Sequence, residues 1–120
     1  MTQFYRFAAV LAVLLMTVGL LLVNTSVFAA DGDPAKGKEI FQAKCVTCHG
    51  PQGKGDGPLG QLLKPPAKDF TSDESKKKSP AELLDTIQNG RPGTGMVAWS
   101  NQLTEPEIQD VLSFVLTLRK

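Results

Sequence analysis

The segment Cys45-Val46-Thr47-Cys48-His49 holds the residues of this chain best suited to bind a metal or form a covalent bond. It contains both cysteines and the only histidine among 120 residues. Cys-x-x-Cys-His is the attachment sequence of a c-type haem. Each thiol adds to one vinyl group of the porphyrin as a thioether, and the histidine that follows becomes an axial ligand of the iron. The spacing therefore predicts one covalent haem c on Cys45 and Cys48, with His49 as an iron ligand.

Three other chemistries use the same residue types. A disulfide between residues three apart closes a very small loop and gains little from chain entropy. A dithiol redox site of the thioredoxin kind normally accompanies a βαβ pattern, which is missing from this sequence. A structural zinc site needs four ligands, whereas the chain has three Cys and His side chains. Haem attachment is the interpretation that the sequence favours.

Met96 is the candidate for the second axial ligand. Met1 and Met16 lie in an N-terminal apolar segment, so Met96 is the only methionine in the rest of the chain. It ends the segment Arg91-Pro-Gly-Thr-Gly-Met96, whose glycines let the backbone approach a flat ligand closely. An isolated methionine more often fills a gap in a core, but this loop setting favours coordination. A His/Met ligand pair raises the reduction potential of haem iron.

Three helices are predicted to position these residues. Asp33 and Pro34 are a helix start, and this helix should extend to about Val46. Capping boxes at Ser79 and Thr104 begin the other two. Gly90 ends the second helix, and the third extends to the C-terminal residues with an apolar stripe of Ile108, Val111, Leu112, Val115 and Leu118. No alternating strand pattern is present. The sequence predicts an all-α fold with Gly- and Pro-rich loops around the haem.

Composition limits the remaining possibilities. Thirteen Lys and Arg against twelve Asp and Glu give a net charge of +1, which excludes nucleic-acid binding through bulk positive charge. Only one long apolar run occurs, which excludes a protein with several membrane spans. The residues after that run are poor in apolar side chains, so a bound cofactor should supply part of the core.

The N-terminal segment has the pattern of an export signal. Arg6 is its only charged residue and precedes the apolar run Phe7–Val23. Small side chains at Val27 and Ala29 favour cleavage after Ala29. We therefore expect a signal peptide over 1–29 and a haem domain over 30–120. An uncleaved N-terminal anchor is the alternative, and only then would the protein be attached to a membrane. Either way the domain should be periplasmic or otherwise exported.

On these residues the chain resembles a class I monohaem cytochrome c of the bacterial type. The resemblance covers about Asp33–Lys120. It rests on the Cys-x-x-Cys-His motif, the glycine loop after it, Met96-x-x-Trp99 and the final amphipathic helix. The family implies that the first and last helices cross and enclose the haem with a middle helix. Gly37, Phe41 and Phe114 would occupy the crossing.

The resemblance also implies roles for two further residues. Family members hold the haem histidine by a hydrogen bond from its other ring nitrogen to a proline carbonyl, and Pro58 has a suitable spacing from His49. The stretch Lys64–Phe70 departs from the shortest family members. Trp99 would either donate its indole N–H to a haem propionate or form a wall of the haem pocket.

The predicted function is that of an electron carrier and not of an enzyme. One electron would pass by outer-sphere transfer between transient redox protein partners, and the carrier should be a monomer. An alternative is a haem-based sensor or a peroxidase-like enzyme in which Met96 leaves the iron. A cytochrome subunit of a larger oxidoreductase complex would have the same chemistry as a free carrier.

Overall fold

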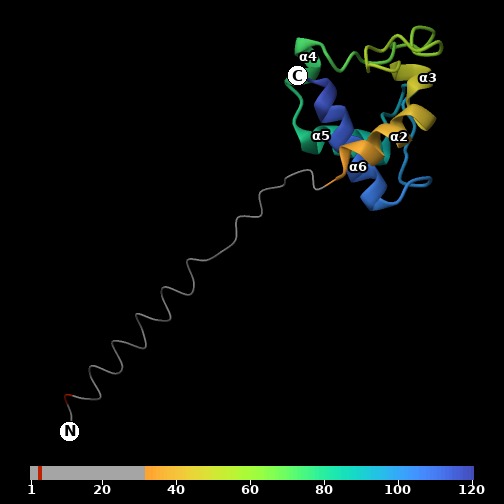
Figure 1. Cartoon of the computed structure of the whole chain (residues 1–120). Helices are drawn as coiled ribbons and strands as arrows, with labels where there is room; N and C mark the ends of the chain where they lie inside the picture. The colour runs from red at the N-terminus through yellow and green to blue at the C-terminus, as the bar shows by residue number, and fades with distance from the viewer. Residues whose placement is uncertain (1–2, 4–31) are drawn as a thin grey trace.

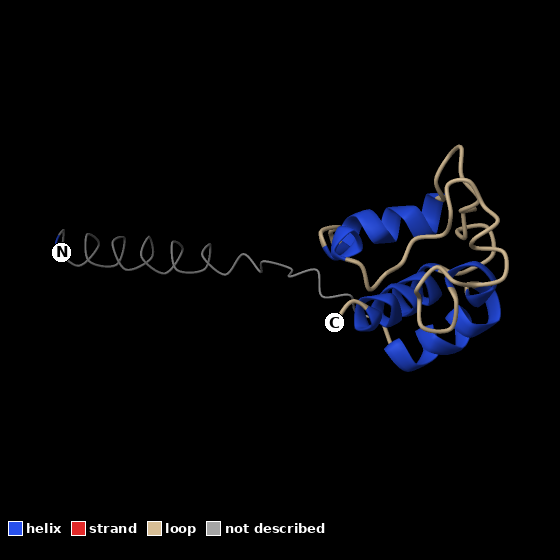
Figure 2. Cartoon of the chain, turned by 90° about the horizontal axis from the view of Figure 1, so that it is seen from above, coloured by secondary structure: helices blue, strands red, loops and turns tan. Residues whose placement is uncertain are grey.

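The computed structural model describes residue 3 and residues 32–120, and this part of the chain consists of helices and loops without a strand (Figures 1 and 2). The predicted signal peptide over 1–29 lies, apart from residue 3, outside the described residues. In chain order the helices are α2 (Pro34–Lys44), α3 (Val46–His49), α4 (Asp73–Lys76), α5 (Pro80–Asn89) and α6 (Glu105–Leu118). None of the helices in the described part is long and apolar enough to cross a membrane.

The two capping boxes form as predicted. The Ser79 amide donates to the Glu82 carboxylate at 2.7 Å, and the Glu82 amide donates back to the Ser79 hydroxyl at 3.2 Å. The Thr104 amide likewise donates to the Glu107 carboxylate at 2.8 Å. These bonds favour the ionised carboxylates and lower the pKa of Glu82 and of Glu107. Both helices therefore begin where the local sequence satisfies their first free amides.

The first helix is shorter than predicted. α2 ends at Lys44, and Cys45 is its C-cap, with its amide donating to the Phe41 carbonyl at 2.8 Å. A separate turn, α3, then carries Val46–His49. The short helix α4, capped by Ser72, was not predicted because a four-residue helix leaves no periodic pattern.

α2 crosses α6, and this crossing organises the core (Figure 1). The Asp33 amide donates to the Asp110 carboxylate at 2.6 Å, which joins the two helices at one end. The Phe41 ring meets the Phe114 ring edge-on, with centroids 5.2 Å apart. The residues predicted for the crossing thus lie in it. The buried apolar core consists of Phe41, Leu83, Ile87, Leu103, Ile108, Val111, Leu112, Phe114 and Val115.

Replacing Gly37 with Ala should destabilise the crossing. A Cβ at Gly37 would collide with the backbone carbonyl of Asp110, which cannot move without displacing α6. We expect a loss of about 2–3 kcal/mol, or about 10–20 °C in Tm for a domain of this size. The sign of the change in the free energy of unfolding is informative, because replacing Gly with Ala stabilises an isolated helix by about 1 kcal/mol. Thermal unfolding followed by circular dichroism measures it. Lys38→Ala, at an exposed position of α2, is the control, and equal melting of both variants would contradict the expectation.

Candidate functional site

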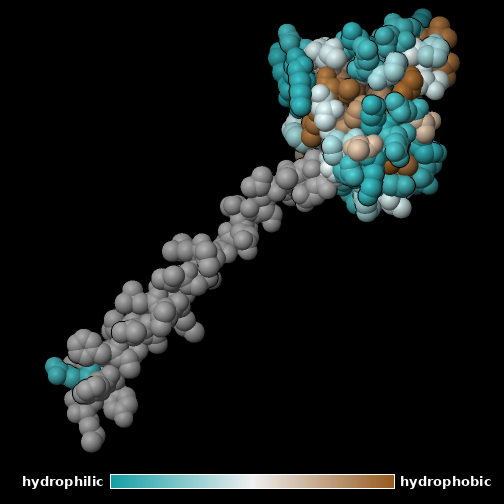
Figure 3. All heavy atoms as spheres, viewed as in Figure 1, coloured by the Kyte–Doolittle hydropathy of each residue, from teal (hydrophilic) through white to brown (hydrophobic). Residues whose placement is uncertain are grey.

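A cavity of about 590 Å³ lies against the core. Its volume falls within the range of roughly 300–1,000 Å³ that is usual for cofactor pockets. The face of the domain in Figure 3 shows apolar residues gathered in its middle between hydrophilic ones. The cavity brings together side chains that are far apart in the chain. The haem motif supplies Cys45, Cys48 and His49, and α5 and α6 supply Leu83, Ile87, Val111 and Val115. The long loop and α4 supply Leu63, Pro65, Pro66, Ala67, Lys68, Phe70, Ser72, Glu74 and Ser75, and the loop after α5 supplies Met96 and Trp99.

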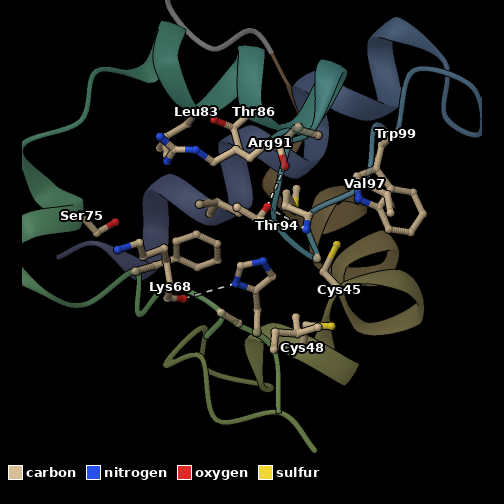
Figure 4. A pocket seen from close by; sticks show the side chains of 18 of the residues that line it. Cys45, Cys48, Lys68, Ser75, Leu83, Thr86, Arg91, Thr94, Val97 and Trp99 are labelled. Carbon is tan, nitrogen blue, oxygen red and sulfur yellow. Dashed lines mark hydrogen bonds between the residues drawn. The ribbon is translucent and has the colours of Figure 1, made fainter. Parts of the chain in front are cut away.

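His49 is held with one ring nitrogen free to bind a metal. Its Nδ1 lies 3.3 Å from the backbone carbonyl oxygen of Lys68, the contact drawn as the dashed line at Lys68 in Figure 4. A carbonyl only accepts, so Nδ1 carries the proton and Nε2 keeps its lone pair. Burial lowers the pKa of His49 below its usual value, which keeps the ring neutral at pH 7. A neutral imidazole is the form that ligates iron.

The carbonyl at His49 comes from Lys68, which corrects the prediction that Pro58 supplies it. After α3 the chain folds back on the motif, where the Gly57 amide donates to the Cys48 carbonyl at 3.2 Å and the Leu59 amide to the Thr47 carbonyl at 3.0 Å. Pro58 is therefore kept beside the motif backbone and does not line the cavity. The chain reaches the imidazole only after Pro65 and Pro66, in the stretch where it departs from the shortest family members.

The two cysteines are half-buried free thiols at the cavity wall. Burial, with a smaller contribution from neighbouring Cys48, raises the pKa of Cys45 to about 11. Cys45 is therefore a protonated thiol at neutral pH. Dithiol redox sites depend on a thiol whose pKa is lowered, so the surroundings of Cys45 do not suit that chemistry. Two thiols next to an imidazole in an apolar cavity fit covalent haem attachment.

The Met96 loop is closed by hydrogen bonds that the sequence did not reveal. The Arg91 amide donates to the Met96 carbonyl at 3.0 Å. The Thr94 hydroxyl donates to the Arg91 carbonyl at 2.8 Å and accepts from the Met96 amide at 3.1 Å. Gly90, with φ of +68°, lies so close that a Cβ would meet the Met96 carbonyl 2.6 Å away. Thr94 thus orients the backbone of Met96; a threonine two residues before it in a Gly-rich turn was the available signal.

Trp99 lies at the end of the cavity that holds Cys45, together with Val97, whereas Lys68 and Ser75 lie at the opposite end (Figure 4). Its amide donates to the Ile87 carbonyl at 3.0 Å, and the Lys44 ammonium lies 5.8 Å from its ring centroid. Trp99 thus forms part of the cavity wall.

An all-α fold that encloses a cavity bearing Cys-x-x-Cys-His and a methionine loop defines a haem protein of the c type. The family model described as Cytochrome c matches residues 34–119, and the chain belongs to this family. It is a monohaem class I cytochrome c, and its cofactor is one covalent haem c. Cys45 and Cys48 fit the attachment motif.

Relatives of two kinds are similar to this chain. The cbb3-type cytochrome c oxidase subunit FixP of Azorhizobium caulinodans is 42% identical over 94 residues, which cover 75% of this chain but only 30% of that protein. Cytochrome c6 of Rippkaea orientalis is 32% identical over 91 residues, covering 73% of each. Among solved structures, the KustC0563 c-type cytochrome superposes with a TM-score of 0.61 at 27% identity, over 70% of this chain and 98% of that one.

Proposed function

We propose that this cytochrome carries single electrons on one haem c, with thioethers from Cys45 and Cys48 and with His49 and Met96 as the axial ligands of iron. When bound, the haem supplies an iron that changes between its ferrous and ferric forms. The observation that carries the proposal is that one cavity is lined by both thiols, by an imidazole whose Nε2 is free, and by the methionine thioether.

The surrounding residues suit electron transfer better than catalysis. The Met96 thioether favours reduced iron and so raises the reduction potential. His49 is the only histidine of the chain, so no second imidazole is left to move protons for peroxide chemistry. The hydrogen bonds at Lys68 and Thr94 hold both ligand segments in place. The protein's part is to keep the ligands fixed while an electron passes through.

Covalent attachment is tested on the purified full chain, produced in a host that attaches haem c. After denaturation and extraction with acidified solvent, the protein should keep its colour. Its measured mass should exceed the mass calculated from its amino-acid sequence by one haem. Thioether formation adds each S–H across a vinyl group, so no atoms are lost. Complete extraction of the colour, or two thiols that still react with an alkylating reagent, would overturn the proposal.

We further propose that 1–29 is a cleaved signal peptide and that the domain acts outside the cytoplasm as a monomeric carrier between redox proteins. The charge pattern and apolar run of this segment support export. The names of the relatives, an oxidase subunit and cytochrome c6, support redox protein partners. The mass of the exported protein tests the boundary. A polypeptide that begins at Ala30 supports cleavage, and one that retains residues 1–29 supports an anchor.

Thr94→Val should weaken the hold on Met96 without changing either ligand. The change removes the hydroxyl that joins Arg91 to the Met96 amide. Losing these bonds costs about 1–2 kcal/mol, so the Met-dissociated form should become about 5–30 times more populated. Stopped-flow binding of cyanide to the ferric protein should accelerate by that factor. Thr86→Val is the matched control, because Thr86 also lines the cavity but donates to Glu82 of its own helix. Equal rates in both variants would contradict the expectation.

A further inference from the structure

We propose that Phe70 is a positioning residue that fixes the rotation of the His49 ring by stacking on its face. This inference rests on the proposed role of His49 as an iron ligand. The two ring centroids lie 4.6 Å apart and the ring planes differ by 18°, which is a stacked arrangement. Phe70 lies 21 positions after His49, in the stretch that departs from the shortest family members, and no motif in the sequence includes it.

The contacts around His49 restrain different movements of its ring. The Lys68 carbonyl lies at the Nδ1 edge, but its distance of 3.3 Å is longer than the usual 2.9–3.0 Å of such bonds, so it resists rotation weakly. Phe41 meets the imidazole at a tilt, with centroids 6.5 Å apart. A flat ring against the imidazole face opposes rotation about the Cβ–Cγ bond directly. Because the stack lies above the ring plane, it leaves the in-plane lone pair of Nε2 unobstructed.

Phe70 is itself held in place by its neighbours, so its ring can limit the rotation of the His49 ring. Its amide donates to the Gly53 carbonyl at 2.7 Å. Next to it, the Asp69 carboxylate accepts from the Thr71 amide and hydroxyl, both at 2.7 Å, and the Ser72 hydroxyl donates to the Asp69 carbonyl at 2.8 Å. The Phe70 ring also packs against Phe41, with centroids 6.4 Å apart. Backbone and side chain are thus anchored on separate partners.

Gly53 shows how closely this segment packs. A Cβ at Gly53 would approach the side chains of Phe70 and Leu118, each to 2.8 Å, and its φ of +69° favours glycine. The glycine loop after the haem motif thereby lets the Phe70 segment come up to the back of His49. The stack joins the loop, the motif and the C-terminal end of α6 in one contact region.

The orientation of the imidazole has a direct spectroscopic consequence. In ferric low-spin haem, the plane of an axial imidazole helps decide which iron d orbital holds the unpaired electron. The spread of the haem methyl signals in proton NMR and the g values in electron paramagnetic resonance both report that orbital. A residue that only stabilises the fold does not alter them, whereas a residue that sets the ring angle does.

The experiment compares three variants of the haem-loaded full chain in the ferric state. Phe70→Leu removes the stacked ring and should change the spread of methyl signals and shift the g values. Phe70→Tyr keeps the ring and should restore the wild-type pattern. Phe114→Leu is the matched control, because Phe114 packs on Phe41 at 5.2 Å in the same cluster. It should lose stability but keep the pattern.

A wild-type pattern in Phe70→Leu, or an equal change in Phe114→Leu, would overturn the proposal. If Phe70→Leu does not fold, the ferrous wild-type protein decides: nuclear Overhauser effects between the Phe70 and His49 ring protons support the stack, and their absence overturns it. Failure of the proposed function would be distinct, because the wild-type protein itself would then lack covalent haem or a His-ligated low-spin spectrum.

Discussion

Replacing both Cys45 and Cys48 with Ala is expected to leave a chain that does not fold cooperatively. Haem would fill a cavity of about 590 Å³ whose walls are largely apolar. Without haem these apolar walls would face water, and the burial of apolar surface that stabilises the fold would be lost. The whole stability of a small domain is only about 5–15 kcal/mol. Without covalent attachment the folded state should therefore lose its net stability.

Circular dichroism during heating measures this outcome, and the double variant should show little helix and no transition. Thr47→Ala is the matched control, since Thr47 lies between the two cysteines with an exposed side chain. It should bind haem and melt as the wild-type protein does. A double variant with a full helical spectrum and a sharp transition would contradict the prediction. It would show that the nine-residue apolar core is enough to stabilise the fold without haem.

Replacing Met96 with His is expected to keep six-coordinate, low-spin iron but to lower the midpoint potential. Imidazole donates more strongly to oxidised iron than a thioether does, so the ferric form gains stability. We expect a decrease on the order of 0.1 V, within the range of about 0.8 V that axial ligands span. Potentiometric titration of the haem-loaded protein measures the change. An unchanged potential would mean that Met96 does not ligate the iron.

Met96→Ala tests the same ligand by removing it instead of replacing it. It should leave one coordination position open, so the ferric protein should bind cyanide and the ferrous protein carbon monoxide within the mixing time. The wild-type protein should bind both slowly, because the Met96 thioether must first leave the iron and the Thr94 bonds hold the backbone of Met96 in place. Fast binding by the wild-type protein would favour the sensor or peroxidase-like alternative over the carrier.

Features that depend on neighbours in the chain could be predicted from the sequence. A capping box is a pair of hydrogen bonds between residues three apart, so Ser79 and Thr104 predicted the starts of α5 and α6. The attachment motif is likewise local, because both thiols and the histidine must reach one porphyrin from adjacent positions. The crossing of α2 and α6 followed from the family resemblance through Gly37, a position with no space for a side chain.

Interactions between distant segments required the tertiary structure. Every residue has a backbone carbonyl, so nothing in the sequence distinguished Lys68 from Pro58 as the partner of His49. The path of the loop decided it, and that path depends on the Gly57 and Leu59 amides folding back on the motif. Phe70 could equally have been a core residue or an exposed one, because a single aromatic side chain in a loop has no periodicity to indicate its direction.

The type of chemistry that we propose for this protein was therefore indicated by the sequence itself, through Cys45, Cys48, His49 and Met96. The way in which the ligand residues are oriented was decided only in three dimensions. Reactive groups are rare in the chain and identify themselves by type and spacing. Their orientation depends on common groups, a carbonyl at Lys68, a phenyl ring at Phe70 and a hydroxyl at Thr94. Such groups acquire a specific role only when packing brings them within a few ångströms of the ligand.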